Sequence, residues 1–227
     1  MNSNMEKPYV VGIDIGGTNT VFGIVDARGT IIASSSIKTG AYEDVNDYVD
    51  EVCKNLLPLI IANGGVDKIK GIGIGAPNGN YYSGTIEFAP NLPWKGVIPL
   101  AAMFEERLGI PTALTNDANA AGIGEMTYGA ARGMKDFIMI TLGTGVGSGI
   151  VINGQMVYGH DGFAGELGHT IIRRETVVSA DADVTVVWKL TARLRVWHVL
   201  PVSPDQEYRA KLVARHSSRK HYFQGCV

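Results

Sequence analysis

Hydrophobic and polar residues alternate in short blocks along most of the chain and predict a mixed α/β fold. Apolar runs bounded by glycine, asparagine and aspartate are typical of strands joined by turns. They predict strands over residues 9–14, 20–26, 30–38, 69–74, 112–115, 137–142 and 149–152. Apolar positions at helical spacing predict helices over residues 43–62, 99–108 and 119–128. The chain therefore begins with antiparallel strands, and only later alternates strands with helices.

Two segments far apart in the chain resemble each other. Ile13–Asn19 and Ile140–Val146 each end an apolar strand, turn through glycine and threonine, and lead into a second apolar strand. This repeat predicts two related halves that face a shared cleft. A glycine-rich turn exposes successive backbone N–H groups, so each turn is either a phosphate-binding hairpin or an ordinary one. The residues in question are Gly16, Gly17, Thr18, Asn19, Gly143, Thr144 and Gly145.

Two familiar nucleotide motifs do not explain these turns. The second turn contains a loose GxGxxG pattern, but a strand follows it, whereas a dinucleotide fingerprint opens a helix. The sequence contains no GxxxxGK[ST], which excludes a P-loop.

Polar side chains at four other places are candidates for chemistry. Asp14 ends the first strand, where its carboxylate could face a metal-bound phosphate. Asn116 and Asp117 lie at a strand-to-helix corner, where Asp117 is either a helix N-cap or a general base. Glu166 and His169 share a face if their segment is helical, and could hold neighbouring hydroxyls or a metal. Asn91 precedes an aromatic residue in a rigid, proline-containing loop.

The composition narrows the class of protein. The chain has 227 residues, of which 45% are hydrophobic, and a net charge of −2, which argues against nucleic acid as the main partner. No apolar run approaches the roughly 18 residues of a membrane span. The N-terminus lacks the pattern of a secretory signal. The two cysteines lie far apart, so we expect a cytoplasmic setting without a disulfide framework.

Together the motifs resemble the ROK family of sugar kinases and repressors, within the actin and hexokinase superfamily. Four segments in the same order carry the resemblance, over roughly residues 8–175: Asp14–Asn19, Asn116–Asn119, Gly143–Gly147 and Gly165–His169. The resemblance implies an α/β fold of the actin-like, hexokinase-type (ribonuclease H-like) ATPase class, with two lobes and an incomplete second lobe. Residues 1–120 would be the N-terminal sugar kinase lobe, and residues 121–175 the start of the C-terminal lobe.

The resemblance also implies roles in ATP-dependent phosphorylation of a hexose. Asp117 would be the catalytic base on the sugar hydroxyl, and the two glycine hairpins would grip the ATP phosphates, with Asp14 close to Mg²⁺. The residues that would bind or back the sugar are Gly79, Asn91, Asn116, Asp117, Glu166 and His169. Glucose is the expected sugar, with N-acetylmannosamine, fructose and allose still open. A homodimer is implied, with no nucleic acid or membrane partner.

The chain changes character near residue 176. All but one of the 29 glycines precede that position, and an acidic excess gives way to a basic one. The family continues after Gly165–His169 with a CxCGxxGC cluster, whose cysteines join His169 on a structural Zn²⁺. This sequence lacks the cluster, so the zinc site is expected to be broken.

Two explanations of the tail are open: a basic extension, or a segment read in another frame. If one base is restored after the codon of Glu175, the codons of the tail can spell the missing cluster in register. We therefore hypothesise that residues 176–227 are frameshifted, unrelated to the family, and disordered.

Three functions are compatible with this sequence: a hexose kinase, a regulator that binds sugar without turnover, and a non-functional pseudogene product. The family's repressors carry an N-terminal helix-turn-helix, and the first phosphate motif begins too early here to leave room for one. We therefore expect a kinase lineage. Because the tail replaces part of the second lobe, we expect weak or no ATP binding and little or no kinase activity.

Overall fold

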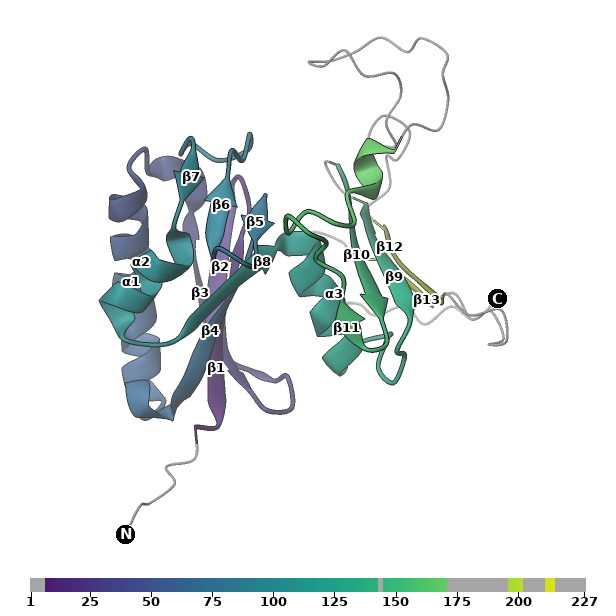
Figure 1. Ribbon diagram of the computed structural model, residues 1–227. Coiled ribbons are helices and arrows are strands. Elements are labelled where there is room, and N and C mark those ends of the chain that lie inside the picture. Colours follow the sequence, from purple (N-terminus) through teal and green to yellow (C-terminus); the bar gives the residue numbers. More distant parts are fainter. Residues whose placement is uncertain (1–6, 143–144, 171–195, 202–210, 215–227) are drawn as a thin grey trace. The chain divides into compact units, whose positions relative to one another are not determined.

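The computed structural model describes residues 7–142, 145–170, 196–201 and 211–214, and the chain divides into two compact units (Figure 1). Unit 1 is Met1–Ala120 and unit 2 is Ala121–Val227.

Unit 1 is built on a five-stranded sheet in the order β3-β2-β1-β4-β8. The strands are β1 (Tyr9–Ile15), β2 (Asn19–Asp26), β3 (Ile31–Lys38), β4 (Ile69–Ala76) and β8 (Thr112–Asn116). The first three are antiparallel, as the sequence predicts, and β4 and β8 continue the sheet in parallel with β1. All five predicted strands of this unit are confirmed, with ends that differ by one or two residues.

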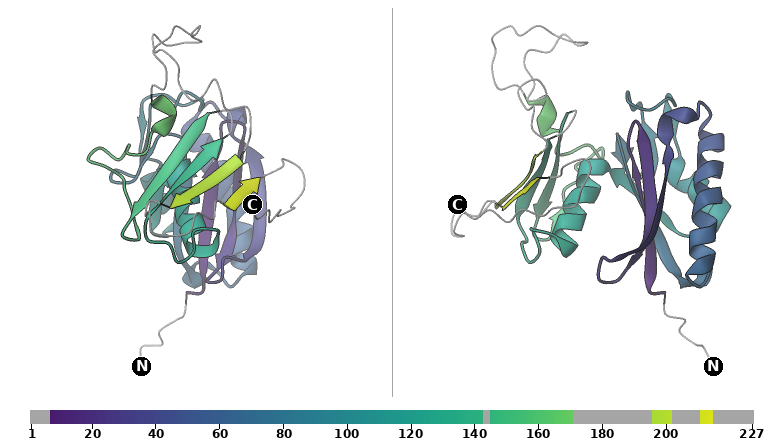
Figure 2. Two further views of the ribbon diagram at one scale, coloured as in Figure 1. Left: turned by 90° about the vertical axis from the view of Figure 1, so that its right-hand side faces the viewer. Right: turned by 180° about the vertical axis from the view of Figure 1, so that it is seen from behind.

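Two helices cover one face of this sheet, α1 (Val45–Ala62) and α2 (Leu100–Leu108) (Figures 1 and 2). The carboxylate of Asp44 accepts the N–H of Asn46 and caps α1. Pro99, expected as the first residue of α2, is its N-cap, and Gly109 ends that helix at φ +64°. Within the described part of the chain, no helix is long and apolar enough to cross a bilayer.

Three very short strands form a second sheet in unit 1: β5 (Gly79–Asn80), β6 (Thr85–Glu87) and β7 (Val97–Ile98). Two short 3-10 helices, η1 (Thr39–Ala41) and η2 (Val66–Lys68), complete the connections. The sequence predicts a loop where β5 lies, because a strand of two residues has no hydrophobic periodicity to detect.

Helix α3 (Asp117–Tyr128) begins directly at the end of β8. The sequence predicts its start two residues later, at Asn119. The side chain of Asn116 accepts the N–H of Ala118 at 2.9 Å, which satisfies a free helical donor and lets the helix begin at Asp117.

Unit 2 contains a sheet in the order β11-β10-β9-β12-β13. Its strands are β9 (Phe137–Leu142), β10 (Val146–Ile152), β11 (Gln155–Met156), β12 (Val196–Pro201) and β13 (Lys211–Ala214). Asn153 and Gly154 have φ of +53° and +74°, which confirms the predicted two-residue hairpin turn between β10 and β11. Strand β10 begins three residues earlier than predicted, since glycines obscure its pattern.

The predicted likeness between the two halves is confirmed at the level of topology. The meander β3-β2-β1 of unit 1 has its counterpart in β11-β10-β9 of unit 2. The sheets differ at the next strand, because β4 is parallel to β1 whereas β12 is antiparallel to β9.

The sequence predicts that the whole tail is disordered, but two short segments of the tail form strands. Residues 196–201 and 211–214 form β12 and β13, and β12 pairs with the edge of β9. A run rich in β-branched and aromatic residues has strand propensity whatever its coding origin, which explains the difference. The rest of residues 176–227 lies outside the described residues, and the frameshift stays a prediction.

Candidate functional site

The first glycine-threonine turn joins β1 to β2 in unit 1. The N–H of Gly16 donates to the carbonyl of Asn19 at 3.0 Å, and the N–H of Thr39 donates to the carbonyl of Thr18 at 3.0 Å. Residues 17–19 are exposed. The loop is therefore anchored by its carbonyls while its tip faces solvent, which is the arrangement that a phosphate cradle needs.

Asp14 lies on β1 just before this loop. Its neighbours Ile13 and Ile15 are buried in the core, and strand alternation places Asp14 on the opposite, exposed side. A single carboxylate beside a phosphate loop fits Mg²⁺, which keeps several waters and takes one or two carboxylates plus substrate phosphates. Asp14 is the residue that would hold the ion, whose chemistry is to neutralise phosphate charge.

Asn91 lies in the loop between β6 and β7, and its backbone packs against the first phosphate turn. A Cβ placed on Gly17 would come within 2.9 Å of the carbonyl oxygen of Asn91, so only glycine allows this close approach. Trp94, in the same loop, is 5% exposed, and its Nε1 donates to the carbonyl of Tyr42 at 3.1 Å. The structure thus brings the Asn91 loop and the first phosphate turn together within unit 1.

Asp117 opens α3 with an accessible carboxylate. Its Oδ1 accepts the N–H of Ala118 at 2.8 Å, but Asp117 is the first residue of the helix, and the capping position is that of Asn116. Crowding by protein atoms partly desolvates the carboxylate and raises its pKa, although the N–H groups of Ala118 and of Asp117 itself oppose the shift. A carboxylate with a raised pKa that solvent can reach is suited to accept a proton.

Gly79 lies in β5, against the strand that leads to Asp117. A Cβ placed on Gly79 would lie 2.6 Å from the carbonyl carbon of Thr115 and 2.8 Å from Cδ2 of Leu114. Glycine is therefore required for β5 to approach β8 this closely. The contact fixes the backbone one residue before Asn116.

A network of polar side chains lies beside Gly79, and the sequence analysis did not predict it. Asn80 is 8% exposed, and its Nδ2 donates to Oε1 of Glu87 at 2.9 Å. The same oxygen accepts the hydroxyl of Thr85 at 2.9 Å, while Nδ2 of Asn78 donates to the carbonyl of Glu87 at 2.9 Å. These bonds hold β5 to β6. Polar residues flanking Gly79 on both sides were the available signal.

The second glycine turn joins β9 to β10 in unit 2. Gly143 and Thr144 lie outside the described residues, so their phosphate role stays a prediction. Gly145 is described, and the N–H of Gly147 donates to Oγ1 of Thr141 at 3.2 Å. The hairpin on either side of the turn is therefore regular.

The segment Gly165–His169 packs directly on β10. The hydroxyl of Ser148 donates to the carbonyl of Gly165. A Cβ placed on Gly168 would collide with the carbonyl oxygen of Val146, so glycine is required at that contact as well. Glu166 and His169, the candidate sugar-binding residues of unit 2, thus belong to a segment that packs on the strand following the second glycine turn.

Glu166 and His169 lie on adjacent turns around the short helix η3 (Leu167–His169). Oε2 of Glu166 lies 3.9 Å from Nε2 of His169, and both side chains are exposed. A carboxylate and an imidazole at this separation can share neighbouring hydroxyls of one ligand. Among the described residues, no three His, Cys, Asp or Glu side chains could hold a metal ion. Glu166 and His169, without further ligands among the described residues, do not fit a structural zinc site.

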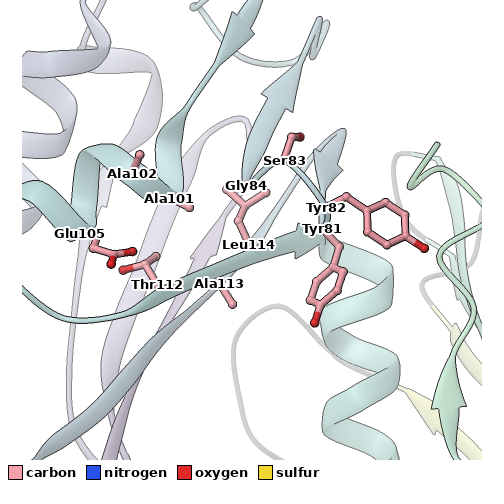
Figure 3. A pocket seen from close by; sticks show the side chains of 10 residues that line it. All are labelled: Tyr81, Tyr82, Ser83, Gly84, Ala101, Ala102, Glu105, Thr112, Ala113 and Leu114. Atoms are coloured by element: carbon pink, nitrogen blue, oxygen red, sulfur yellow. The ribbon is translucent and has the colours of Figure 1, made fainter. Parts of the chain in front are cut away.

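A cavity of about 370 Å³ lies elsewhere in unit 1 (Figure 3). It is lined by residues of the β5–β6 turn, of α2 and of the start of β8: Tyr81, Tyr82, Ser83, Gly84, Ala101, Ala102, Glu105, Thr112, Ala113 and Leu114. None of the predicted sugar-binding residues lines it. This cavity is therefore separate from the candidate site.

The fold and the glycine hairpins define the class of protein. Each unit contains a strand, a tight turn and a returning antiparallel strand, and the fold is similar to that of a solved ROK hexokinase. The ROK family model matches residues 10–180. The chain belongs to the ROK family.

Solved ROK structures share this architecture. A ROK family glucokinase from Streptomyces griseus, in complex with glucose and AMPPNP, is 37% identical with a TM-score of 0.63, covering 73% of this chain and 51% of its own. A ROK hexokinase from Thermus thermophilus is 31% identical with a TM-score of 0.64, covering 73% and 54%. Both matches support the hexokinase-type fold.

Curated relatives include both enzymes and repressors. The glucokinase of Streptomyces coelicolor is 38% identical over 160 residues, which are 70% of this chain and 48% of that protein. The xylose repressor of Caldicellulosiruptor bescii is 42% identical over 191 residues, or 80% and 46%. The chain thus spans about half the length of these relatives.

Proposed function

We propose that the family function of this chain is ATP-dependent phosphorylation of a hexose, with glucose as the substrate and glucose 6-phosphate as the product, and that the altered tail leaves the chain itself only little of that activity. The observation that carries the proposal is Asp117, an accessible carboxylate with a raised pKa at the start of α3. Similarity to glucokinases over residues that include Asp117 supports the choice of reaction and sugar.

In this proposal Asp117 takes the proton of the sugar hydroxyl as the hydroxyl attacks the γ-phosphorus of ATP. The γ-phosphoryl group passes to the sugar oxygen, and ADP leaves. Partial desolvation favours the role, because a raised pKa increases the affinity of the carboxylate for that proton. The hydroxyl-binding residues would be Asn91, Asn116, Glu166 and His169.

The phosphate side of the reaction needs positioning and charge neutralisation more than covalent chemistry. The turn Gly16–Asn19 offers backbone N–H groups to phosphate oxygens, and Asp14 would hold Mg²⁺ beside it. The turn at 143–145 would serve a second set of phosphate oxygens. Glycine and threonine suit both turns, because they keep the backbone accessible.

Single-turnover phosphate transfer tests the proposal. The full chain, in excess over [γ-³²P]ATP and with Mg²⁺ and glucose, should form labelled glucose 6-phosphate, but slowly, because the tail replaces part of the second lobe. Asp117→Asn, a matched neutral variant, should lower the rate by about 10²–10⁴-fold, the usual range for a lost general base. Parallel reactions with N-acetylmannosamine, fructose and allose test the choice of sugar. A faster reaction with any of them than with glucose contradicts that choice.

A sugar-binding regulator is the second candidate, favoured by the similarity to a xylose repressor. Calorimetry with glucose and with xylose separates the two functions. Glucose binding with Asp117-dependent transfer supports the kinase, whereas xylose binding without transfer from ATP supports the regulator.

A further inference from the structure

Three hydroxyl groups form a fully buried chain inside unit 1, outside the residues assigned to substrates. Thr20, Thr39 and Tyr48 each have 0% exposure. Oγ1 of Thr20 lies 2.8 Å from Oγ1 of Thr39 and 2.8 Å from Oη of Tyr48. Burial raises the pKa of the Tyr48 phenol, so the group remains a neutral hydroxyl that can donate. Polar groups this deeply buried are costly unless all of them are paired.

One end of this chain supports the first phosphate turn. Thr20 directly follows the turn on β2, and the N–H of Thr39 donates to the carbonyl of Thr18. The hydroxyl bond between Thr20 and Thr39 therefore ties η1 to the base of the turn. Tyr48, on α1, holds the pair from the helix side of the sheet.

The other end supports the loop that carries Asn91. The rings of Tyr48 and Trp94 are 4.4 Å apart at their centroids, with an angle of 48° between their planes. Trp94 belongs to that loop and is anchored by its bond to the carbonyl of Tyr42. At the loop's far side, Asn91 rests on Gly17 of the phosphate turn. The contacts thus form a closed ring through both loops.

We propose that Tyr48 is a positioning residue that makes the phosphate turn Gly16–Asn19 and the loop Ala89–Trp94 one cooperative unit. The hydroxyl of Tyr48 holds the phosphate turn through Thr20, and its ring holds the Asn91 loop through Trp94. The meaning of this coupling for catalysis rests on the proposed function, since it would set the distance between a phosphate group and a sugar. The alternative is that Tyr48 only fills the core between α1 and the sheet.

Hydrogen exchange of the full chain, measured by mass spectrometry without ligand, separates the two roles. Tyr48→Phe keeps the ring and removes the hydroxyl. Loss of one neutral hydrogen bond should accelerate amide exchange about fivefold. We expect this acceleration in peptides from both loops together, and no change in β4. Ile60→Val, a conservative change at another fully buried position of α1, should leave both loops at the wild-type rate.

A second pair of variants keeps the test decisive if Tyr48→Phe folds poorly. Thr20→Val removes the central hydroxyl at nearly constant shape and should accelerate both loops, whereas Thr20→Ser keeps the hydroxyl and should restore the wild-type rate. Acceleration of the phosphate turn alone, or uniform acceleration across unit 1, overturns the proposal. Because no ligand is used, these outcomes do not depend on whether the chain phosphorylates glucose.

Discussion

Replacing Gly79 by alanine tests how the Asn116–Asp117 corner is held in place. A Cβ at this position would lie 2.6 Å from the carbonyl carbon of Thr115 and 2.8 Å from Cδ2 of Leu114. Backbone of β8 cannot rotate away as a flexible side chain could. Either β5 or β8 must therefore move. A shift of β8 displaces the corner that follows Thr115, and a shift of β5 removes the contact that supports the corner.

The expected loss of unfolding free energy follows from a comparison of Gly79 with Gly73, a glycine that has room for a Cβ. Overpacking a well-packed interior costs about 1–3 kcal/mol. Gly73, in the neighbouring strand β4, has no atom within 4 Å of an added Cβ, so Gly73→Ala should be neutral or should stabilise by about 0.4–1 kcal/mol through the unfolded state. The two alanine variants should therefore differ in unfolding free energy by about 1–4 kcal/mol.

Urea unfolding followed by circular dichroism measures that difference, and calorimetry with glucose measures its effect on the site. Gly79→Ala should lower the unfolding midpoint with an unchanged slope, and should weaken glucose binding. Gly73→Ala should do neither. Equal midpoints for the two variants would refute the packing argument. A destabilised Gly79→Ala that binds glucose normally would refute the claim that this contact positions Asn116 and Asp117.

Further variants probe the other contacts. The pKa of Asp117 is raised in the folded state, so ionisation of its carboxyl group opposes folding. Asp117→Asn should therefore raise the unfolding free energy at neutral pH. Urea titrations at a series of pH values should show this gain disappear below pH 3.8, where the carboxyl group is protonated in both states. Gly168→Ala should collide with the carbonyl of Val146 and abolish Glu166-dependent sugar binding in calorimetry, while leaving unit 1 intact by hydrogen exchange. Gly154→Ala, at φ +74°, should cost about 1 kcal/mol or more in urea unfolding, and Asn153→Gly much less.

Local patterns were sufficient for much of the fold. The strands β1, β2 and β9 consist mostly of apolar residues. The Asn153–Gly154 dipeptide strongly favours the turn observed. The strands β5, β6 and β7 could not be predicted, because two or three residues carry no period and their pairing depends on side chains such as Asn80 and Glu87.

The candidate site was partly predictable for the same reason. The first glycine turn and the Asn116–Asp117 corner are local features, and the structure has both close to where the sequence predicts them. The contacts of Gly17 with Asn91 and of Tyr48 with Thr20 join residues far apart in the chain. A single sequence holds no signal for such pairs, and only packing reveals that the phosphate turn and the Asn91 loop support each other.

The most direct test of the central claim is single-turnover transfer of ³²P from [γ-³²P]ATP to glucose by the full chain and by its Asp117→Asn variant. The account predicts slow formation of labelled glucose 6-phosphate by the unchanged chain and a rate lower still, by about 10²–10⁴-fold, from the variant. Equal rates from the two proteins, or no labelled sugar from either, would contradict it.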